Sequence, residues 1–152
     1  MRENNIPDGM LHDQNLYEIS LENGVLTLSF NIFLSKEEYG ENDFAKKYFE
    51  YKKCHIRCYL EDEYFCDVRL ETTQNKHGKG KFQYLSINEF VEIANEEIKK
   101  RADNPWEYLD TYVSPNIRSA KIELCTDIKY KGTNYSMCTL ELETKEIEYI
   151  WE

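Results

Sequence analysis

The stretch that decides the fold is LYEISLENGVLTLSFNIFL, residues 16–34. At its centre stand Asn23 and Gly24, residue types that readily adopt the positive φ angles of a type I′ turn, which joins the strands of a two-residue hairpin. From residue 26 to residue 34, apolar residues alternate with mostly polar ones, as in a strand with one buried face. The stretch therefore predicts an antiparallel hairpin with one face against a core.

The same alternation recurs farther along the chain. An acidic tripeptide, residues 61–63, separates two alternating runs and predicts a second hairpin, with Cys54, Cys58 and Cys66 on its core face. Alternating runs in the last third predict a three-stranded meander. The expected strands are residues 16–22, 25–34, 54–60, 64–70, 82–85, 120–128, 136–142 and 147–151.

One segment has the period of a helix. Its apolar residues recur every three or four positions and form one stripe, which predicts an amphipathic helix at about residues 86–102. Ser86 and Glu89 form an S-x-x-E capping box at its start. Two segments stay open: residues 106–113 fit a short helical turn or a strand, and residues 35–47 fit a loop or a frayed helix.

The order of these segments defines the expected fold class. It reads ββββ(β)αβββ, which is an α+β fold with about seven strands in a mainly antiparallel sheet and one main helix. We find no linker and no internal repeat, so residues 1–152 are expected to form a single domain. Residues 1–14 are polar and rich in turn-forming residues, and we expect an irregular lead-in there.

Composition narrows the partners and the compartment. The chain has 29 acidic and 19 basic residues, a net charge of −10, which argues against binding to nucleic acid or to an anionic membrane and is compatible with a basic protein partner. The start, MRENNIPDGM, lacks the apolar run of a signal peptide, and no apolar run is long enough to span a membrane. Together with five cysteines in strand-like runs, this predicts a cytoplasmic protein with free, packed thiols.

No motif in the chain predicts catalysis or a cofactor. Cys54 and Cys58 flank His55, but strand alternation turns His55 to the opposite face, and no second cysteine pair completes a zinc site. His77 lies in an exposed basic loop, residues 72–81, which cannot hold a catalytic base in a fixed position. We therefore predict no catalytic residue, no metal and no cofactor, and we favour a protein that is not an enzyme.

Two sets of residues are candidates for binding. Glutamates gather on the expected outward faces of the last two strands, where like charges are mildly destabilising unless they face a basic partner; a merely solvated face is the alternative. These candidate protein-binding residues are Glu141, Glu143, Glu146 and Glu148. His12 and Asp13 form a possible polar site before the first strand, although such a pair also serves to cap a turn.

The N-terminal part of the chain resembles a known group of proteins. Residues 10–19, MLHDQNLYEI, and residues 24–30, GVLTLSF, are similar to the opening of several families of small bacterial proteins, in which L-H-D-x-x-[LI]-x-x-I leads into G-x-L-x-L-x-F. Many members are uncharacterised, and some are immunity proteins of polymorphic toxin systems. The resemblance implies a small cytoplasmic protein that neutralises a cognate toxin by binding it. It assigns no functional residues, because such families recognise different toxins with different surfaces.

Three functions remain as hypotheses. The first is a non-catalytic protein-binding module, most specifically an immunity-like inhibitor of a basic toxin. The second is a small-molecule-binding or enzymatic domain with an aromatic-lined pocket between sheet and helix. The third is a structural or oligomeric subunit that uses residues 145–151 as a sheet edge. The sequence leaves the oligomeric state open.

Overall fold

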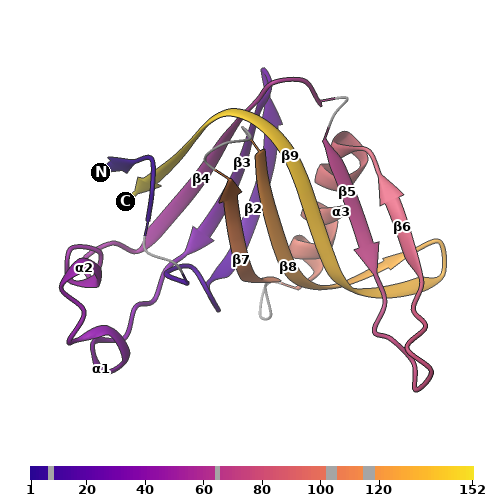
Figure 1. Ribbon diagram of the computed structural model, residues 1–152, viewed down its shortest axis with the longest axis horizontal. Coiled ribbons are helices and arrows are strands. Elements are labelled where there is room, and N and C mark those ends of the chain that lie inside the picture. The colour runs from indigo at the N-terminus through magenta and orange to yellow at the C-terminus, as the bar shows by residue number, and fades with distance from the viewer. Residues whose placement is uncertain (7–8, 64–65, 102–105, 115–118) are drawn as a thin grey trace.

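The predicted hairpin at Asn23–Gly24 is part of one antiparallel sheet that takes up every strand of the described residues (Figure 1). The computed structural model describes residues 1–6, 9–63, 66–101, 106–114 and 119–152. The α+β class, with a mainly antiparallel sheet and one main helix, is confirmed. In chain order the elements are β1 (Arg2–Glu3), β2 (Asn15–Glu22), β3 (Val25–Asn31), α1 (Lys36–Tyr39), α2 (Asp43–Lys46), β4 (Lys53–Leu60), β5 (Asp67–Glu71), β6 (Phe82–Leu85), α3 (Ile87–Lys100), β7 (Trp106–Ser114), β8 (Ser119–Tyr130) and β9 (Thr133–Trp151).

The β2–β3 hairpin forms as the sequence predicts. Asn23 and Gly24 have φ angles of 52° and 74°, the left-handed values that a type I′ turn needs at both central residues. Glu22 pairs with Val25 directly across the turn. Leu26, Leu28 and Phe30 of β3 face inward and are fully buried, so the turn sets the register that places them in the core.

The expected second hairpin is wrong. β4 and β5 do not pair with each other; both lie antiparallel along one edge of β9, one after the other. The acidic residues 61–63 do not reverse the chain, because the Glu61 N–H donates to the Glu143 carbonyl of β9 at 2.9 Å and keeps the chain along that strand. β4 instead pairs with β3 on its other edge, and β5 pairs with β6.

The expected meander is also wrong, because its last two strands are one strand, β9. Tyr59 of β4 pairs with Glu146, and its neighbour Leu60 pairs with Thr144, so one residue of β9 between these pairs has no partner on β4. Lys145 is therefore the extra residue of a β-bulge, which moves the inward side of β9 from even to odd positions. In the sequence, the buried positions change from even to odd numbers near residue 145, which resembles a turn between two strands. The structure shows that this change is produced by the bulge.

The sheet curls round until it meets itself. From β9 the hydrogen-bonded neighbours run through β4, β3, β2, β7 and β8, and β8 pairs with β9 again. Residues 106–114 form strand β7, which decides between the two structures expected there. The closing contact between β2 and β7 consists of two residue pairs, Asn15 with Glu107 and Leu16 with Trp106. The result is a strongly curled, half-barrel sheet with a weak seam between β2 and β7 (Figure 1).

Helix α3 lies beside this seam. The Ser86 hydroxyl accepts a hydrogen bond from the Glu89 N–H at 3.2 Å, so the predicted cap is present. The Asn95 side chain bonds to β2 as a strand would: Oδ1 accepts from the Ile19 N–H, and Nδ2 donates to the Ile19 carbonyl. Asn95 thereby satisfies the backbone of β2 beyond the point where its pairing with β7 ends.

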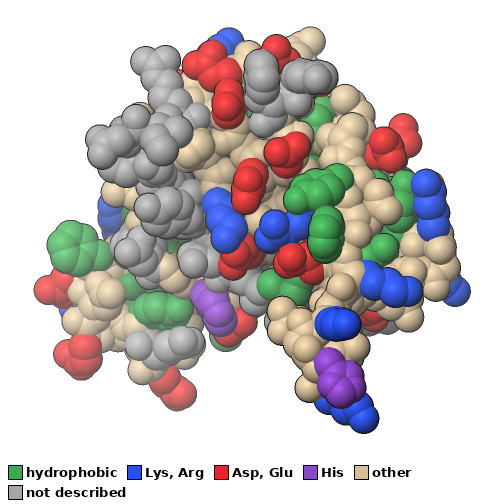
Figure 2. Space-filling model, turned by 45° about the vertical axis from the view of Figure 1, so that its right-hand side comes forward, with side chains coloured by type: hydrophobic (Ala, Val, Ile, Leu, Met, Phe, Trp, Pro, Cys, Tyr) green, Lys and Arg blue, Asp and Glu red, His purple; other side chains and the backbone are tan. Residues whose placement is uncertain are grey.

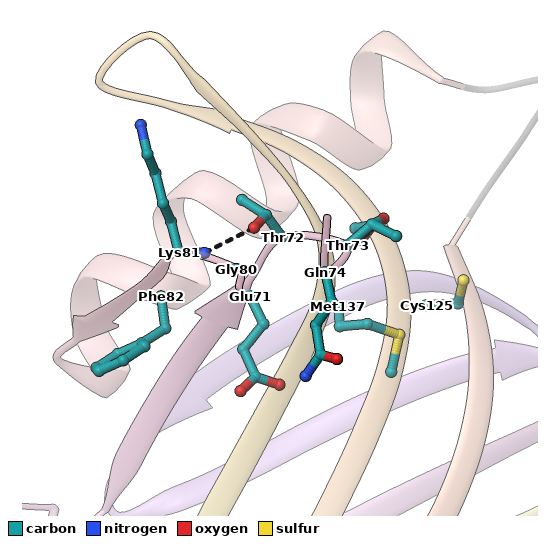
Figure 3. A pocket seen from close by; sticks show the side chains of 10 residues that line it. Glu71, Thr72, Thr73, Gln74, Gly80, Lys81, Phe82, Cys125 and Met137 are labelled. Atoms are coloured by element: carbon teal, nitrogen blue, oxygen red, sulfur yellow. Dashed lines mark hydrogen bonds between the residues drawn. The ribbon is translucent and has the colours of Figure 1, made fainter. Parts of the chain in front are cut away.

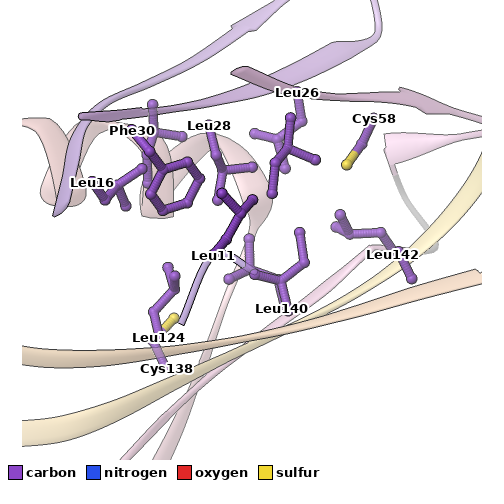
Figure 4. Packing of buried hydrophobic residues seen from close by; sticks show 14 of the residues in the cluster. Leu11, Leu16, Leu26, Leu28, Phe30, Cys58, Leu124, Cys138, Leu140 and Leu142 are labelled. Carbon is purple, nitrogen blue, oxygen red and sulfur yellow. The ribbon is translucent and has the colours of Figure 1, made fainter. Parts of the chain in front are cut away.

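The core fills the inside of the curled sheet. α3 contributes an apolar stripe to it, of which Phe90 and Ala94 are fully buried. Figure 4 shows two sides of the core facing each other, with Leu26, Leu28 and Phe30 from β3 and Leu124, Cys138, Leu140 and Leu142 from β8 and β9. Along the strands, apolar and polar residues alternate as the sequence predicts, because one face of each strand packs against this core.

The remaining segments are short. Residues 35–47 contain two four-residue helices, α1 and α2, capped by Ser35 and Asn42. The expected irregular lead-in includes β1, which pairs with Tyr149 and Ile150 of β9. Among the helices of the described residues, none has the length and apolar character needed to cross a membrane.

Replacing Asn95 by alanine should destabilise the protein. The change leaves the Ile19 N–H and carbonyl without their partners next to a side chain that is 1% exposed. An unsatisfied buried polar group costs about 1–3 kcal/mol, so we expect the free energy of unfolding to fall by about 2 kcal/mol in urea denaturation. Asn88→Ala, at an exposed position of the same helix, is the matched control. Equal stability of the two variants would contradict the role of Asn95.

Candidate functional site

The four predicted glutamates all lie on β9, on both sides of the bulge at Lys145. This corrects the expected placement on two neighbouring strands. Glu141, Glu143 and Glu146 are exposed, and each can meet a partner from solution.

Glu148 differs from the other three. Its side chain is 15% exposed, and its carboxylate accepts a hydrogen bond from the Tyr59 hydroxyl at 2.7 Å. This bond holds the pKa of Tyr59 above its ordinary value. Arg57 and Arg2 also approach the carboxylate, each at 4.0 Å. Because Glu148 already has these partners, we leave it out of the surface that follows.

Other acidic residues surround the three exposed glutamates. Asp67 of β5 pairs directly with Glu141 across the sheet, so two carboxylates stand on adjacent strands. Residues 61–63 run past Glu143 through the backbone hydrogen bond described above. We define the acidic surface as Glu61, Asp62, Glu63, Asp67, Glu141, Glu143 and Glu146. The sequence analysis found its β9 members but missed Asp67, because only the pairing of β5 with β9 brings it there.

Basic side chains also lie on the outer face of the sheet, among them Lys145, which is exposed and lines the same hollow as residues 61–63. Two others, Arg69 and Lys121, form ion pairs with glutamates of their own strands. Nε of Arg69 lies 3.1 Å from Oε1 of Glu71, and Nζ of Lys121 lies 2.7 Å from Oε1 of Glu123. Figure 2 shows acidic and basic side chains alternating in the middle of the molecule, with hydrophobic side chains beside them. Within the described residues, Asp67 has no ion-pair partner. Lys121 pairs directly with Glu141 across β8 and β9, and Glu141 helps to raise the pKa of both Lys121 and Arg69. The carboxylate of Asp67 is therefore a member of the acidic surface for which the described residues supply no paired cation.

Two aromatic side chains stand exposed on the same outer face. Phe82 and Tyr84 of β6 are 63% and 54% exposed, and their rings meet edge to face with centroids 5.7 Å apart. Tyr84 pairs across the sheet with Arg69, and Phe82 pairs with Glu71. The sequence analysis missed this aromatic pair, defined by Phe82 and Tyr84. Their spacing of two residues, with Leu85 needed in the core, is the signal that places both outside.

A groove borders the aromatic pair. It has a volume of about 580 Å³ and is bounded by the end of β5, the start of β6 and the first part of β9. Figure 3 shows Glu71 and Gln74 directed the same way, with Met137 beside Gln74 and Lys81 turned away from Glu71. The Lys81 N–H donates to the Thr72 hydroxyl at 2.8 Å and fixes the rim. The groove thus opens next to the exposed ring of Phe82.

The cysteines of the described core are not reactive groups. Burial raises the pKa of Cys58 to about 12 and raises the pKa values of Cys54, Cys66 and Cys138 as well. A thiol held in its neutral form is a poor nucleophile and a poor metal ligand. Cys125 is exposed, which corrects the expectation that all five thiols are packed. Among the described residues, no group of three or more His, Cys, Asp or Glu side chains could hold a metal ion.

One histidine does contact a hydroxyl. His55 lies outward, as predicted, with Nδ1 2.8 Å from the Ser29 hydroxyl and Nε2 3.4 Å from Oε2 of Glu152. The order of these groups resembles a catalytic triad, but Ser29 is 4% exposed. A substrate cannot reach that hydroxyl, so the contact serves to pack the outer face of the sheet.

His12 and Asp13 do come together. Nδ1 of His12 lies 2.9 Å from Oδ2 of Asp13, and both side chains are exposed. Asp13 has a φ angle of 60°, as expected for a residue that closes a turn. The pair lines a pocket of about 490 Å³ at the end of the β2–β3 ladder. The structure thus shows a turn and a pocket at this position, which the sequence analysis treated as alternatives.

The other two hypotheses expect a pocket between the sheet and the helix, and a sheet edge formed by residues 145–151. The structure places both features differently. The contact between α3 and the sheet is packed with buried side chains such as Phe90, and the pocket at His12 lies outside it. Residues 145–151 are not a terminal strand of the sheet, because β4 pairs along one side of them and β1 reaches the other side at Tyr149 and Ile150.

Comparisons with known proteins give no relative to compare this surface with. No family model matches the chain, and neither a curated protein nor a solved structure matches it. The resemblance of the N-terminal hairpin to families that include immunity proteins therefore stays a prediction.

Thiol labelling can test the exposure of the cysteines. We expect a water-soluble maleimide to modify one cysteine in the folded protein, Cys125, and to modify the other four at a rate set by unfolding. Cys125→Ser should abolish the fast reaction, as mass spectrometry of the intact protein would show. Rapid labelling of a second cysteine in that variant would contradict the buried assignment.

Proposed function

We propose that this chain is a non-catalytic protein-binding module whose acidic surface and aromatic pair together bind a basic protein. The hairpin resemblance makes the proposal more specific: a cytoplasmic, immunity-like inhibitor of a basic toxin in a bacterium. Inhibition then requires occupation of the toxin surface and no chemistry on the part of the inhibitor. Its described histidines and thiols fit such a role, because none is arranged as an accessible nucleophile with a base.

The single observation that carries the proposal is the opposition of Asp67 and Glu141 across β5 and β9, in line with Glu143 and Glu146. Like charges directly opposite each other destabilise a sheet by a few tenths of a kcal/mol to about 1 kcal/mol. Glu141 already has Lys121 opposite it on β8 and interacts with Arg69, whereas no ion pair is formed by Asp67 within the described residues. A basic partner would supply the missing charge, and its attraction would speed the encounter.

The aromatic pair would supply binding energy that holds a partner after charge has brought it close. Interfaces take most of their binding energy from a few anchors, which are enriched in aromatic residues and surrounded by polar contacts. Phe82 and Tyr84 stand beside the paired side chains of Arg69 and Glu71, and the groove begins at Phe82. We therefore assign steering to the acidic surface and retention of the partner to the aromatic pair.

Capture from the native host tests the proposal directly. The wild-type protein is immobilised beside two variants with equal changes of net charge: Asp67→Lys, Glu141→Lys and Glu143→Lys in one, and Glu22→Lys, Glu92→Lys and Glu96→Lys in the other, all at exposed positions. We expect a basic protein to be retained by the wild type and by the second variant, and to be lost from the first. No such protein, or equal retention by both variants, would overturn the proposal.

The same two variants should associate with the captured partner at different rates. At low salt the first should associate about tenfold more slowly than the wild type, because the steering field of the acidic surface is reversed. The second changes net charge equally but leaves the acidic surface intact, so its association rate should fall less. Surface plasmon resonance at two salt concentrations would measure both rates. If both variants associated equally slowly, the effect would come from net charge alone, and the acidic surface would have no special role in association.

Replacing Phe82 or Tyr84 by alanine should change the dissociation rate of the complex and not its association rate. Each truncation should weaken binding roughly tenfold, mainly through faster dissociation, since an aromatic anchor contributes about 1–2 kcal/mol or more. The control is Phe44→Ala, which removes another aromatic ring that is 75% exposed and lies on α2. An unchanged dissociation rate in the Phe82 and Tyr84 variants would remove the aromatic pair from the interface.

A further inference from the structure

The pocket at His12 and Asp13 is separate from the acidic surface and has a construction of its own. Its volume of about 490 Å³ falls in the range of small-molecule sites. It opens between the turn that holds His12 and Asp13, the last residue pair of the β2–β3 ladder, and Tyr39 at the end of α1. That pair is Asn15 and Asn31, directly opposite each other.

One buried amide fixes the walls of this pocket. Gln14 is 7% exposed, and its Oε1 accepts a hydrogen bond from the Phe33 N–H at 2.7 Å. Its Nε2 donates to the His12 carbonyl at 3.2 Å. Met10 and Leu11, which are 2% and 1% exposed, anchor the same turn in the core. The turn is thereby tied to the end of β3, so the pocket is formed before any ligand arrives.

The polar groups of the pocket suit a ligand with both donors and acceptors. Asn15 and Asn31 each present an amide, which can donate and accept at once. The Asp13 carboxylate adds an acceptor, and its contact with Nδ1 of His12 holds it in place. Neither asparagine side chain is hydrogen-bonded to another residue of the described chain. Two of the polar side chains that line this hollow, Asn15 and Asn31, therefore have unused hydrogen-bonding capacity.

Charge limits the ligand further. No lysine or arginine is among the described residues that line the pocket, and Asp13 repels anions. A phosphate group would find no cation here, so we exclude nucleotides and sugar phosphates as preferred ligands. The ligand should be neutral or weakly cationic.

An aromatic ring at the rim indicates the shape of the ligand. Phe33 is 82% exposed, the highest value among the large exposed hydrophobic residues of the described chain, and it borders the pocket. Stacking of a nucleobase on an aromatic side chain contributes about five- to a hundredfold in affinity. Paired amides also match the edge of a base, as when asparagine binds adenine through two hydrogen bonds. We propose that this pocket binds a phosphate-free nucleoside through its base, with Phe33 as the stacking platform and Asn15, Asn31 and Asp13 on the base edge.

A titration followed by amide chemical shifts tests this site. Adenosine, guanosine, cytidine and uridine are added in turn to the full-length protein, with adenosine monophosphate and a methyl glycoside as comparisons. We expect saturable shifts at Asn15, Asn31 and Phe33 with at least one nucleoside, and weaker binding of the monophosphate. Failure of all four nucleosides to shift these amides at their solubility limits would overturn the proposal. Binding of the glycoside in place of the nucleosides would overturn the assignment to a base.

Two variants separate the site from the general fold. Phe33→Ala removes the platform, and the double variant Asn15→Ala, Asn31→Ala removes the edge contacts; both concern exposed side chains, so thermal unfolding should change little. Each should weaken nucleoside binding about tenfold or more. Phe44→Ala is the matched control and should bind as the wild type does. Loss of binding in the control, or normal binding in both pocket variants, would contradict the geometry.

Discussion

The structure depends on the uninterrupted pairing of β9. This 19-residue strand pairs with β8 and β5 through its first part and with β4 through its second. One strand thus holds both ends of the curled sheet together, and the bulge at Lys145 lets it turn without breaking the ladder. Without the bulge, Ile147, Tyr149 and Trp151 would face solvent, because a shift of one residue exchanges the two faces of a strand. The core and the outer face therefore both follow from this single extra residue.

The sequence predicts those features that depend on neighbouring residues. Asn23-Gly24 specifies its turn through backbone conformation, and Ser86 specifies the start of α3 through a hydrogen bond three residues away. Pairing between distant strands has no such local signal. The bulge at Lys145 and a tight turn both appear in the sequence as a shift of the apolar phase, and only the partner strand distinguishes them. The candidate surface divides in the same way: the β9 glutamates are visible in the sequence, whereas Asp67 joins them through register.

The weak seam between β2 and β7 explains the position of α3. β2 and β7 share two residue pairs, so beyond them the backbone of β2 needs other partners. Asn95 supplies both a donor and an acceptor to Ile19, and the apolar stripe of α3 closes the core at the same place. The helix thereby takes the role of a missing strand. Because α3 packs against the core with its apolar stripe, it does not cover the outer face of β9, β5 and β6, where the acidic surface and the aromatic pair lie.

An uncovered face can tolerate opposed carboxylates because the other side of the same strands is buried. Val68 and Leu70 of β5 and Leu140 of β9 have no exposed surface. Burial of one such side chain contributes about 1.5–3 kcal/mol, whereas one pair of opposed like charges costs about 1 kcal/mol at most. The core therefore outweighs the repulsion between Asp67 and Glu141, and the pairing of β5 with β9 is stable with two carboxylates opposite each other. Residues on this outer face can therefore change without loss of the fold, because the buried side of the same strands carries its stability.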